Sequence, residues 1–182
     1  GLLGPALFEA MSATAMATIG EFRPQELANI AWACATLRVR DTPLLDAIAA
    51  AALKSIRDFN PRDLAQTAWA CATLDYRHEP LLKAISSAAM ARIGDWEAAK
   101  LSNLVWAFAT LGFRDRQLLE AVADAAKARI GEFIPQGLSN TAWAFAVLRF
   151  GDPPLFEAIA SAAMPLLRDF NAQNVSNTAW AF

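Results

Sequence analysis

Tryptophan recurs in this chain at a constant interval of 37 residues. It occupies Trp32, Trp69, Trp106, Trp143 and Trp180. Aligning the chain on this interval superposes FRPQELANIAWACATL from residue 22, FNPRDLAQTAWACATL from 59, WEAAKLSNLVWAFATL from 96 and FIPQGLSNTAWAFAVL from 133. A period of this length, continued along the whole chain, is typical of stacked repeats that bury a shared core. The sequence therefore predicts a single repeat array.

The repeat divides the chain into four complete units with a partial unit at each end. We expect one array over residues 1–182, and because its last residues still follow a helical pattern, we expect it to belong to a longer protein. The predicted units are 1–21 (partial), 22–58, 59–95, 96–132, 133–169 and 170–182 (partial).

Each unit reads as two helices, which we call helix A and helix B. Helix A begins near Pro24, Pro61 or Pro135, where proline suits the first helical turn, and runs for about fourteen residues. The chain is 55% hydrophobic, largely through alanine, which loses least on entering a helix. We predict an all-α fold, an α-solenoid forming a right-handed superhelix of two-helix, 37-residue repeats.

Helix B follows a short turn and supplies apolar side chains at helical spacing. We expect it to end at Gly94 and Gly131 in two units, since glycine adopts the left-handed conformation that closes many helices. An aspartate before its first turn is placed to cap the helix, and these aspartates form a column along the repeats. His78 occupies the aspartate's position in one unit. The aspartates of this column are Asp41, Asp115 and Asp152.

Several classes of function are disfavoured by the composition. The net charge of −2 excludes a uniformly basic nucleic-acid binder but not a local basic stripe. No apolar run reaches the roughly 18 residues of a membrane span, so no membrane partner is expected. Cys34 and Cys71 fall at a core position. No nucleophile–base pair or phosphate loop stands apart from the repeat, so we predict no enzyme activity, cofactor, metal or small-molecule substrate.

One face of helix A is polar in an unusual way, because it carries amides and threonines where solvated helices carry Glu and Lys. Side-chain amides donate and accept hydrogen bonds and can pair with base edges. Alanines between the polar columns would leave room for a flat group. The central column is Asn29, Gln66, Asn103, Asn140 and Asn177. The flanking columns are Thr36, Thr73 and Thr110, and Gln25, Arg62, Gln136 and Gln173.

Two explanations of the amide column stay open. Parallel helices would align one amide per repeat, the geometry by which helical repeats read single-stranded RNA one base at a time. Alternatively, the amides form a structural ladder between neighbouring helices. Gln66, in place of asparagine, favours a variable reader over a fixed clamp.

Two further columns carry a binding and a structural interpretation each. Arg40, Arg77 and Arg114 recur in the turn between the two helices, where they could hold successive phosphates or be solvated. The tryptophans border the polar face, where they could pack between units or stack on bases.

The motif in helix A resembles that of the octotricopeptide-repeat proteins. It is also similar to the helical repeats of FAST-kinase-domain proteins and of RNA-editing substrate-binding complex subunits. PQGLSNTAWAFAVL (135–148), AQNVSNTAWAF (172–182) and PQELANIAWACATL (24–37) carry the resemblance, which covers the whole chain. The third repeat departs from it at Trp96, Ala98 and Lys100.

The resemblance implies a nuclear-encoded organellar protein that binds RNA and controls its processing, stability or translation. We expect the mitochondrial matrix rather than the plastid stroma, with single-stranded RNA and other organellar RNA-processing proteins as partners. Protein scaffolding is the alternative function, because helical repeats often bind proteins. It predicts apolar or charged anchors on the inner face.

Overall fold

The computed structural model describes residues 5–182, and side chains from residue 7 onward. The first four residues of the predicted partial unit 1–21 lie outside this range. The described residues form ten α-helices without a strand, which confirms the predicted all-α solenoid. The A helices are α2 (Pro24–Thr36), α4 (Pro61–Thr73), α6 (Ala98–Thr110), α8 (Pro135–Val147) and α10 (Ala172–Ala181). The B helices are α1 (Pro5–Thr18), α3 (Thr42–Ser55), α5 (Glu79–Met90), α7 (Arg116–Ala128) and α9 (Pro153–Ala163).

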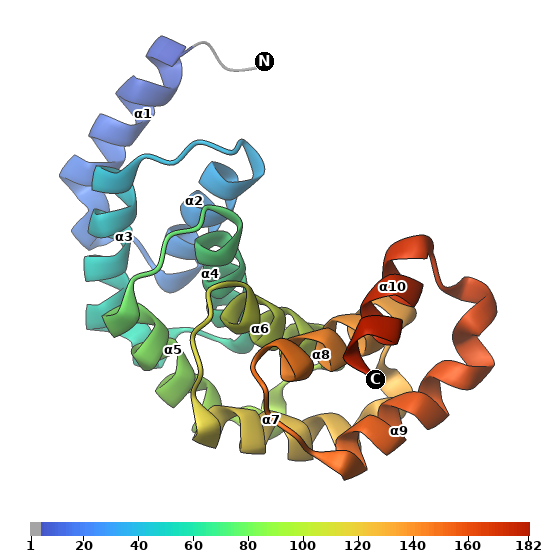
Figure 1. Ribbon diagram of the computed structural model, residues 1–182. Coiled ribbons are helices and arrows are strands. Elements are labelled where there is room, and N and C mark those ends of the chain that lie inside the picture. Colours follow the sequence, from blue (N-terminus) through green and yellow to red (C-terminus); the bar gives the residue numbers. More distant parts are fainter. Residues whose placement is uncertain (1–4) are drawn as a thin grey trace.

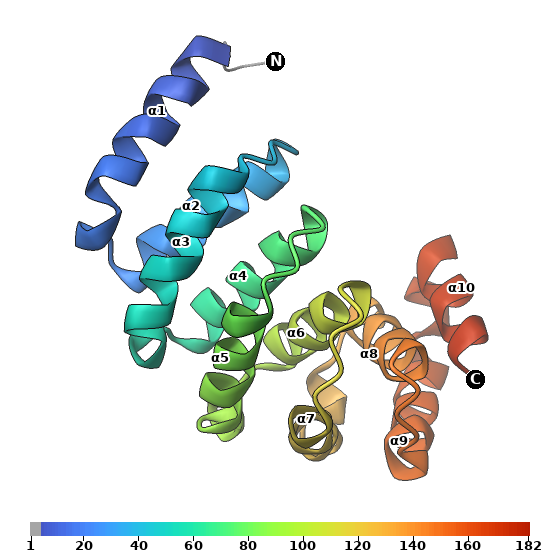
Figure 2. The same cartoon turned by 60° about the vertical axis from the view of Figure 1, so that its left-hand side comes forward.

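The two kinds of helix form two rows along a curved array. In Figure 1 the A helices follow the inside of the curve and the B helices follow the outside. Figure 2, turned by 60°, shows the same stacking of successive helix pairs. We call these the inner row and the outer row. The side chains that the A helices expose beside their mutual contacts form the inner face.

The inner row is the more closely packed of the two. Each A helix makes its most extensive contacts with the next A helix, whereas neighbouring B helices touch less. Buried alanines line these contacts, including Ala68, Ala107 and Ala142, and small side chains let helix axes approach closely. The array therefore curves toward its A helices.

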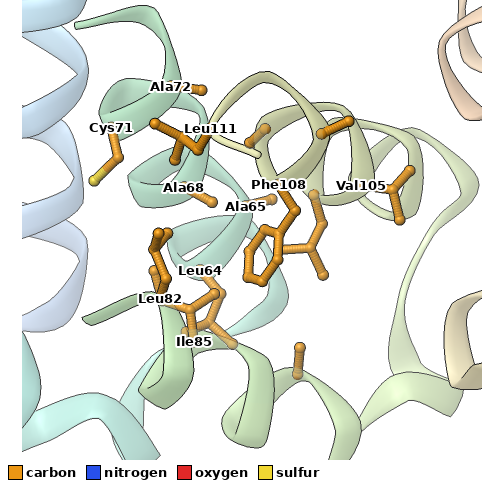
Figure 3. Packing of buried hydrophobic residues seen from close by; sticks show 14 of the residues in the cluster. Leu64, Ala65, Ala68, Cys71, Ala72, Leu82, Ile85, Val105, Phe108 and Leu111 are labelled. Carbon is orange, nitrogen blue, oxygen red and sulfur yellow. The ribbon is translucent and has the colours of Figure 1, made fainter. Parts of the chain in front are cut away.

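The core lies between the two rows and continues from unit to unit. Figure 3 shows Leu64 and Cys71 of α4, Leu82 and Ile85 of α5, and Phe108 of α6 in this layer. Burial raises the pKa of the Cys71 thiol to about 12 and also raises the pKa of Cys34. Both cysteines thus occupy the predicted core position as inert apolar groups.

The predicted ends of the B helices are wrong. The α5 and α7 helices end at Met90 and Ala128, and each is followed by a short 3₁₀ segment, Ile93–Asp95 or Ile130–Glu132. Gly94 and Gly131 lie inside these segments and do not have a positive φ. The 3₁₀ turns tighten the chain before the next A helix, so a left-handed residue is not required there.

The left-handed conformation occurs at the ends of the A helices instead. Tyr76 N–H donates to the Cys71 carbonyl at 2.8 Å, and Asp75 N–H donates to the Ala72 carbonyl at 3.2 Å. These two bonds define a Schellman motif, which places its left-handed residue just past the helix. The left-handed residues are Arg38, Asp75, Gly112 and Arg149, with φ between 50° and 62°.

The predicted capping column of the B helices is confirmed. Asp41, Asp115 and Asp152 each accept a hydrogen bond from a backbone N–H in the first turn of the following helix. His78 does the same through Nδ1, accepting from Leu81 N–H at 3.2 Å. The only histidine is therefore a helix cap.

The outer row also carries polar contacts between units. Ser12 Oγ donates to Asp41 Oδ2 at 2.5 Å, and Ser86 Oγ donates to Asp115 Oδ2 at 2.7 Å. Each serine lies on a B helix and each aspartate caps the next B helix. The same carboxylate therefore both begins a helix and ties it to the preceding unit.

Candidate nucleic-acid interface

The amide column runs along the inner row, one residue per A helix, but its members differ in environment. Gln66 Nε2 donates to the Ala28 carbonyl and to Asn29 Oδ1, both at 3.1 Å. Among the described residues, no such bond links Gln66, Asn103, Asn140 and Asn177 to one another. One step of the column is therefore a structural ladder, and the later steps leave their amide groups without that role.

The prediction that Gln66 favours a variable reader over a fixed clamp is wrong. Its extra methylene lets the amide reach across to the preceding helix, so this glutamine is the clamp of the column. Asn103 and Asn177 are half-buried, and Asn140 is 8% exposed. Asn29 is the one exposed member of the column.

The alanines between the polar columns do not leave an open space. Ala70, Ala107 and Ala144 are at most 1% exposed, because the neighbouring A helix packs directly on them. The small side chain is needed for helix approach, so a flat group cannot reach these three alanines, whereas Ala33 and Ala181 in the terminal A helices are half-buried. This corrects the expectation that the alanines admit a ligand.

The flanking columns lie on the exposed part of the inner row. All members of the glutamine and arginine column are exposed near the beginnings of the A helices, and all three threonines are exposed near their ends. These side chains are Gln25, Arg62, Gln136 and Gln173, and Thr36, Thr73 and Thr110. Their roles as RNA contacts stay predictions.

The turn arginines are engaged to different degrees. Arg77 pairs with Glu79 at 3.1 Å, and Arg114 donates to the Arg149 carbonyl of the next unit at 3.3 Å. Arg40 is exposed. A row of equally available phosphate contacts is therefore not formed here, although each guanidinium keeps part of its surface exposed.

A hollow of about 200 Å³ opens between α2, α4 and α6, and we call it the basic groove. Trp32 and Trp69 contribute aromatic walls, and Arg62 and Lys100 contribute cationic groups. Trp32 is 47% exposed, so much of its ring faces solvent. Gln66, Asn103 and Ala65 complete the lining. Aromatic faces, amides and cations are the groups that single-stranded nucleic acids engage.

A second hollow of about 210 Å³ lies one repeat further along, between α6 and α8, and we call it the neutral groove. Ala99 and Gly137 occupy the positions in this groove that Arg62 and Lys100 occupy in the basic groove, 37 residues earlier in the chain. Glu132 adds a carboxylate that is paired with Arg129 at 3.6 Å, and Asn103 and Asn140 add amides. The two grooves therefore share Asn103 and both carry amides, but the neutral groove has neither the cations nor the tryptophans of the basic groove in its lining.

The repeat pattern predicts Arg62 on the polar face, but it does not predict a place there for Lys100, which departs from the repeat. The available signal was the register: Lys100 follows Arg62 by 38 residues, which brings adjacent positions of successive A helices together. Recognising a shared groove required the spacing between helices.

Residues 5–182 contain no group of three or more His, Cys, Asp or Glu side chains arranged for a metal ion. Within the same range, no helix combines the length and apolarity that crossing a membrane requires.

The stacked helix pairs define a helical-repeat protein of the α-solenoid class, with a polar and aromatic inner face. A family model described as RNA-editing substrate-binding complex 6 protein matches residues 6–182. The chain belongs to this family, which is one of those that the helix A motif resembles. No curated protein matches the chain.

Proposed function

We propose that this protein binds single-stranded RNA selectively along its inner face and acts in mitochondrial RNA editing. The observation that carries the proposal is the inner row itself, where Asn103, an amide without a ladder partner, lies beside tryptophan and cationic side chains. The family description supports an RNA-editing context and a protein complex as the setting.

We propose binding rather than catalysis, with no cofactor, metal or small-molecule substrate, and with other RNA-processing proteins as partners. The relation to octotricopeptide-repeat proteins and a role in RNA stability or translation belong to the same proposal. At one nucleotide per repeat, five A helices would span about five nucleotides.

Protein scaffolding is the second candidate, favoured by the 47% exposure of Trp32 and by a family named after a complex. Large exposed apolar side chains commonly mark protein contacts. The two functions are separated by their response to changes in the amides.

The test is enrichment from a randomised single-stranded RNA pool at near-physiological salt. Asn103→Ala combined with Gln136→Ala should weaken binding to an enriched motif by about 1–3 kcal/mol per lost base contact and relax its sequence preference. Gln117→Ala, an exposed amide on the outer helix α7, is the matched control and should change nothing. No enrichment with the unaltered protein would refute RNA binding and leave scaffolding.

A further inference from the structure

We propose that the basic groove is a nucleotide subsite, in which Trp32 and Trp69 stack on a base and Arg62 and Lys100 hold an adjoining phosphate. The inference rests on the proposed RNA-binding function and narrows it to one place on the inner face. It also implies that the repeats contribute unequally, because the equivalent groove further along lacks both cations.

The aromatic step of the argument concerns exposure. Trp32 and Trp69 come from successive A helices and line the same hollow. Trp69 is half-buried between units, whereas Trp32 leaves 47% of its surface in solvent. Packing therefore accounts for part of this pair, and the remaining ring surface is available to stack on a base, which every base can do through its π-face.

The cationic step concerns partners. Over the described residues, neither Arg62 nor Lys100 lies within 4 Å of a carboxylate, while other cations such as Arg77 and Arg116 are paired. In the two adjacent inner-face columns, this is the one pair of positions that carries two cations. The two cations suit the phosphate of a nucleotide, and the aromatic wall beside them suits its base.

The amide step concerns preorganisation. Gln66 is held by its two hydrogen bonds through Nε2, so its orientation is set before a ligand arrives. Its Oε1 accepts no hydrogen bond from a described residue and is free to accept one from a ligand. Asn103, also in the lining, can both donate and accept. A side chain fixed in advance loses less entropy on binding.

Binding to a labelled, unstructured RNA of mixed sequence tests the cations, with fluorescence anisotropy measured over a series of salt concentrations. Arg62→Ala with Lys100→Ala should weaken binding and reduce the salt slope by about 0.7, since the two side chains hold one phosphate and each single-strand phosphate contact contributes about 0.7. The matched control removes two exposed lysines of the outer row, Lys54→Ala with Lys83→Ala, and should leave the slope unchanged.

The aromatic arm uses Trp32→Leu, which keeps apolar bulk and removes the stacking surface. Affinity should fall about fivefold or more, with an unchanged salt slope. Trp32→Phe should recover most of that loss. Binding to an abasic oligomer should not respond to Trp32→Leu but should still respond to loss of the two cations. Circular dichroism checks that each variant stays helical.

The outcomes separate the subsite from the wider function. If the unaltered protein binds no RNA, the proposed function fails. If it binds RNA and Gln136→Ala, which lies outside the basic groove, weakens binding, while both groove variants bind like the lysine control, only the subsite is overturned. In that case Trp32 does not contribute to RNA binding.

A gain-of-function variant gives the converse test. Ala99 is the exposed equivalent of Arg62 in the neutral groove, so Ala99→Arg should strengthen RNA binding and steepen the salt slope by about 0.7. Gly137 is not altered, because an added Cβ would lie 3.1 Å from Phe133. No gain with Ala99→Arg would show that a cation at this column does not reach the phosphate.

Discussion

The inner and outer rows use polar side chains for different purposes. On the outer row, Ser86 and Asp115 bond to each other, and the aspartate also caps a helix. On the inner row, the exposed threonines and most amides of the described residues make no hydrogen bond between units, with Gln66 and Asn174 as the exceptions. The comparison teaches that polar residues in a repeat must be judged by their partners, because similar periodicity serves folding in one row and leaves the other available for ligands.

The largest effect is expected from closing the space between inner helices. Ala107→Leu should lower the free energy of unfolding by about 1–3 kcal/mol, because Ala107 is 0% exposed and packs against neighbouring A helices. Chemical denaturation followed by circular dichroism measures the change. Ala50→Leu on the exposed side of α3 is the control, and equal stability of the two variants would contradict close packing of the inner row.

An intermediate effect should separate the two rows directly. Ser86→Ala should lower the free energy of unfolding by about 1 kcal/mol or somewhat more, since it removes a buried hydrogen bond to a carboxylate. Thr110→Ala, on the inner face, should change it by less than about 0.5 kcal/mol, as expected at an exposed position without partners. Similar losses for both would remove the distinction between the rows, and thermal denaturation is sufficient to measure them.

The smallest effect concerns the ends of the inner helices. Asp75→Gly should raise the free energy of unfolding by up to about 1 kcal/mol, because glycine adopts a φ of 50° without steric strain. Gly112→Ala, at the equivalent position with φ 62°, should lower it by a similar amount. Changes of the same sign in the two variants would argue against a left-handed requirement at this column.

The period predicted the fold, the helix starts and the caps because each depends on local chemistry repeated along the chain. Pro61 and Asp115, for example, each predict the beginning of a helix from their own residue type. The left-handed Arg38 and Asp75 could not be predicted this way, since neither residue type demands that conformation. The backbone there follows from the Schellman bonds and the apolar contact beyond the helix.

The candidate site was predicted in its residue types but not in its geometry. A helical wheel gives the direction of a side chain from its own axis, and it placed the threonines, Arg62 and the glutamines of its column correctly on the exposed side. In the central amide column only Asn29 is exposed, while Asn140 is buried. It cannot give the distance to the next helix, which decides that Ala107 is covered and that Gln66 reaches Asn29. Whether Trp32 and Lys100, which lie on different helices, line one groove depends on the same distance between helices.

The alanines of the inner row also set the distance between neighbouring A helices, because their small volume determines how closely the helices pack. This distance is the spacing at which the array presents its exposed side chains. A repeat array adds the same step at every unit, so an increment in that spacing accumulates along the chain. A strand held in the basic groove would stay in step with nearby helices and drift out of step with distant ones if the alanines were enlarged throughout. The length of ligand that the array can follow is thus set by the uniformity of its smallest residues.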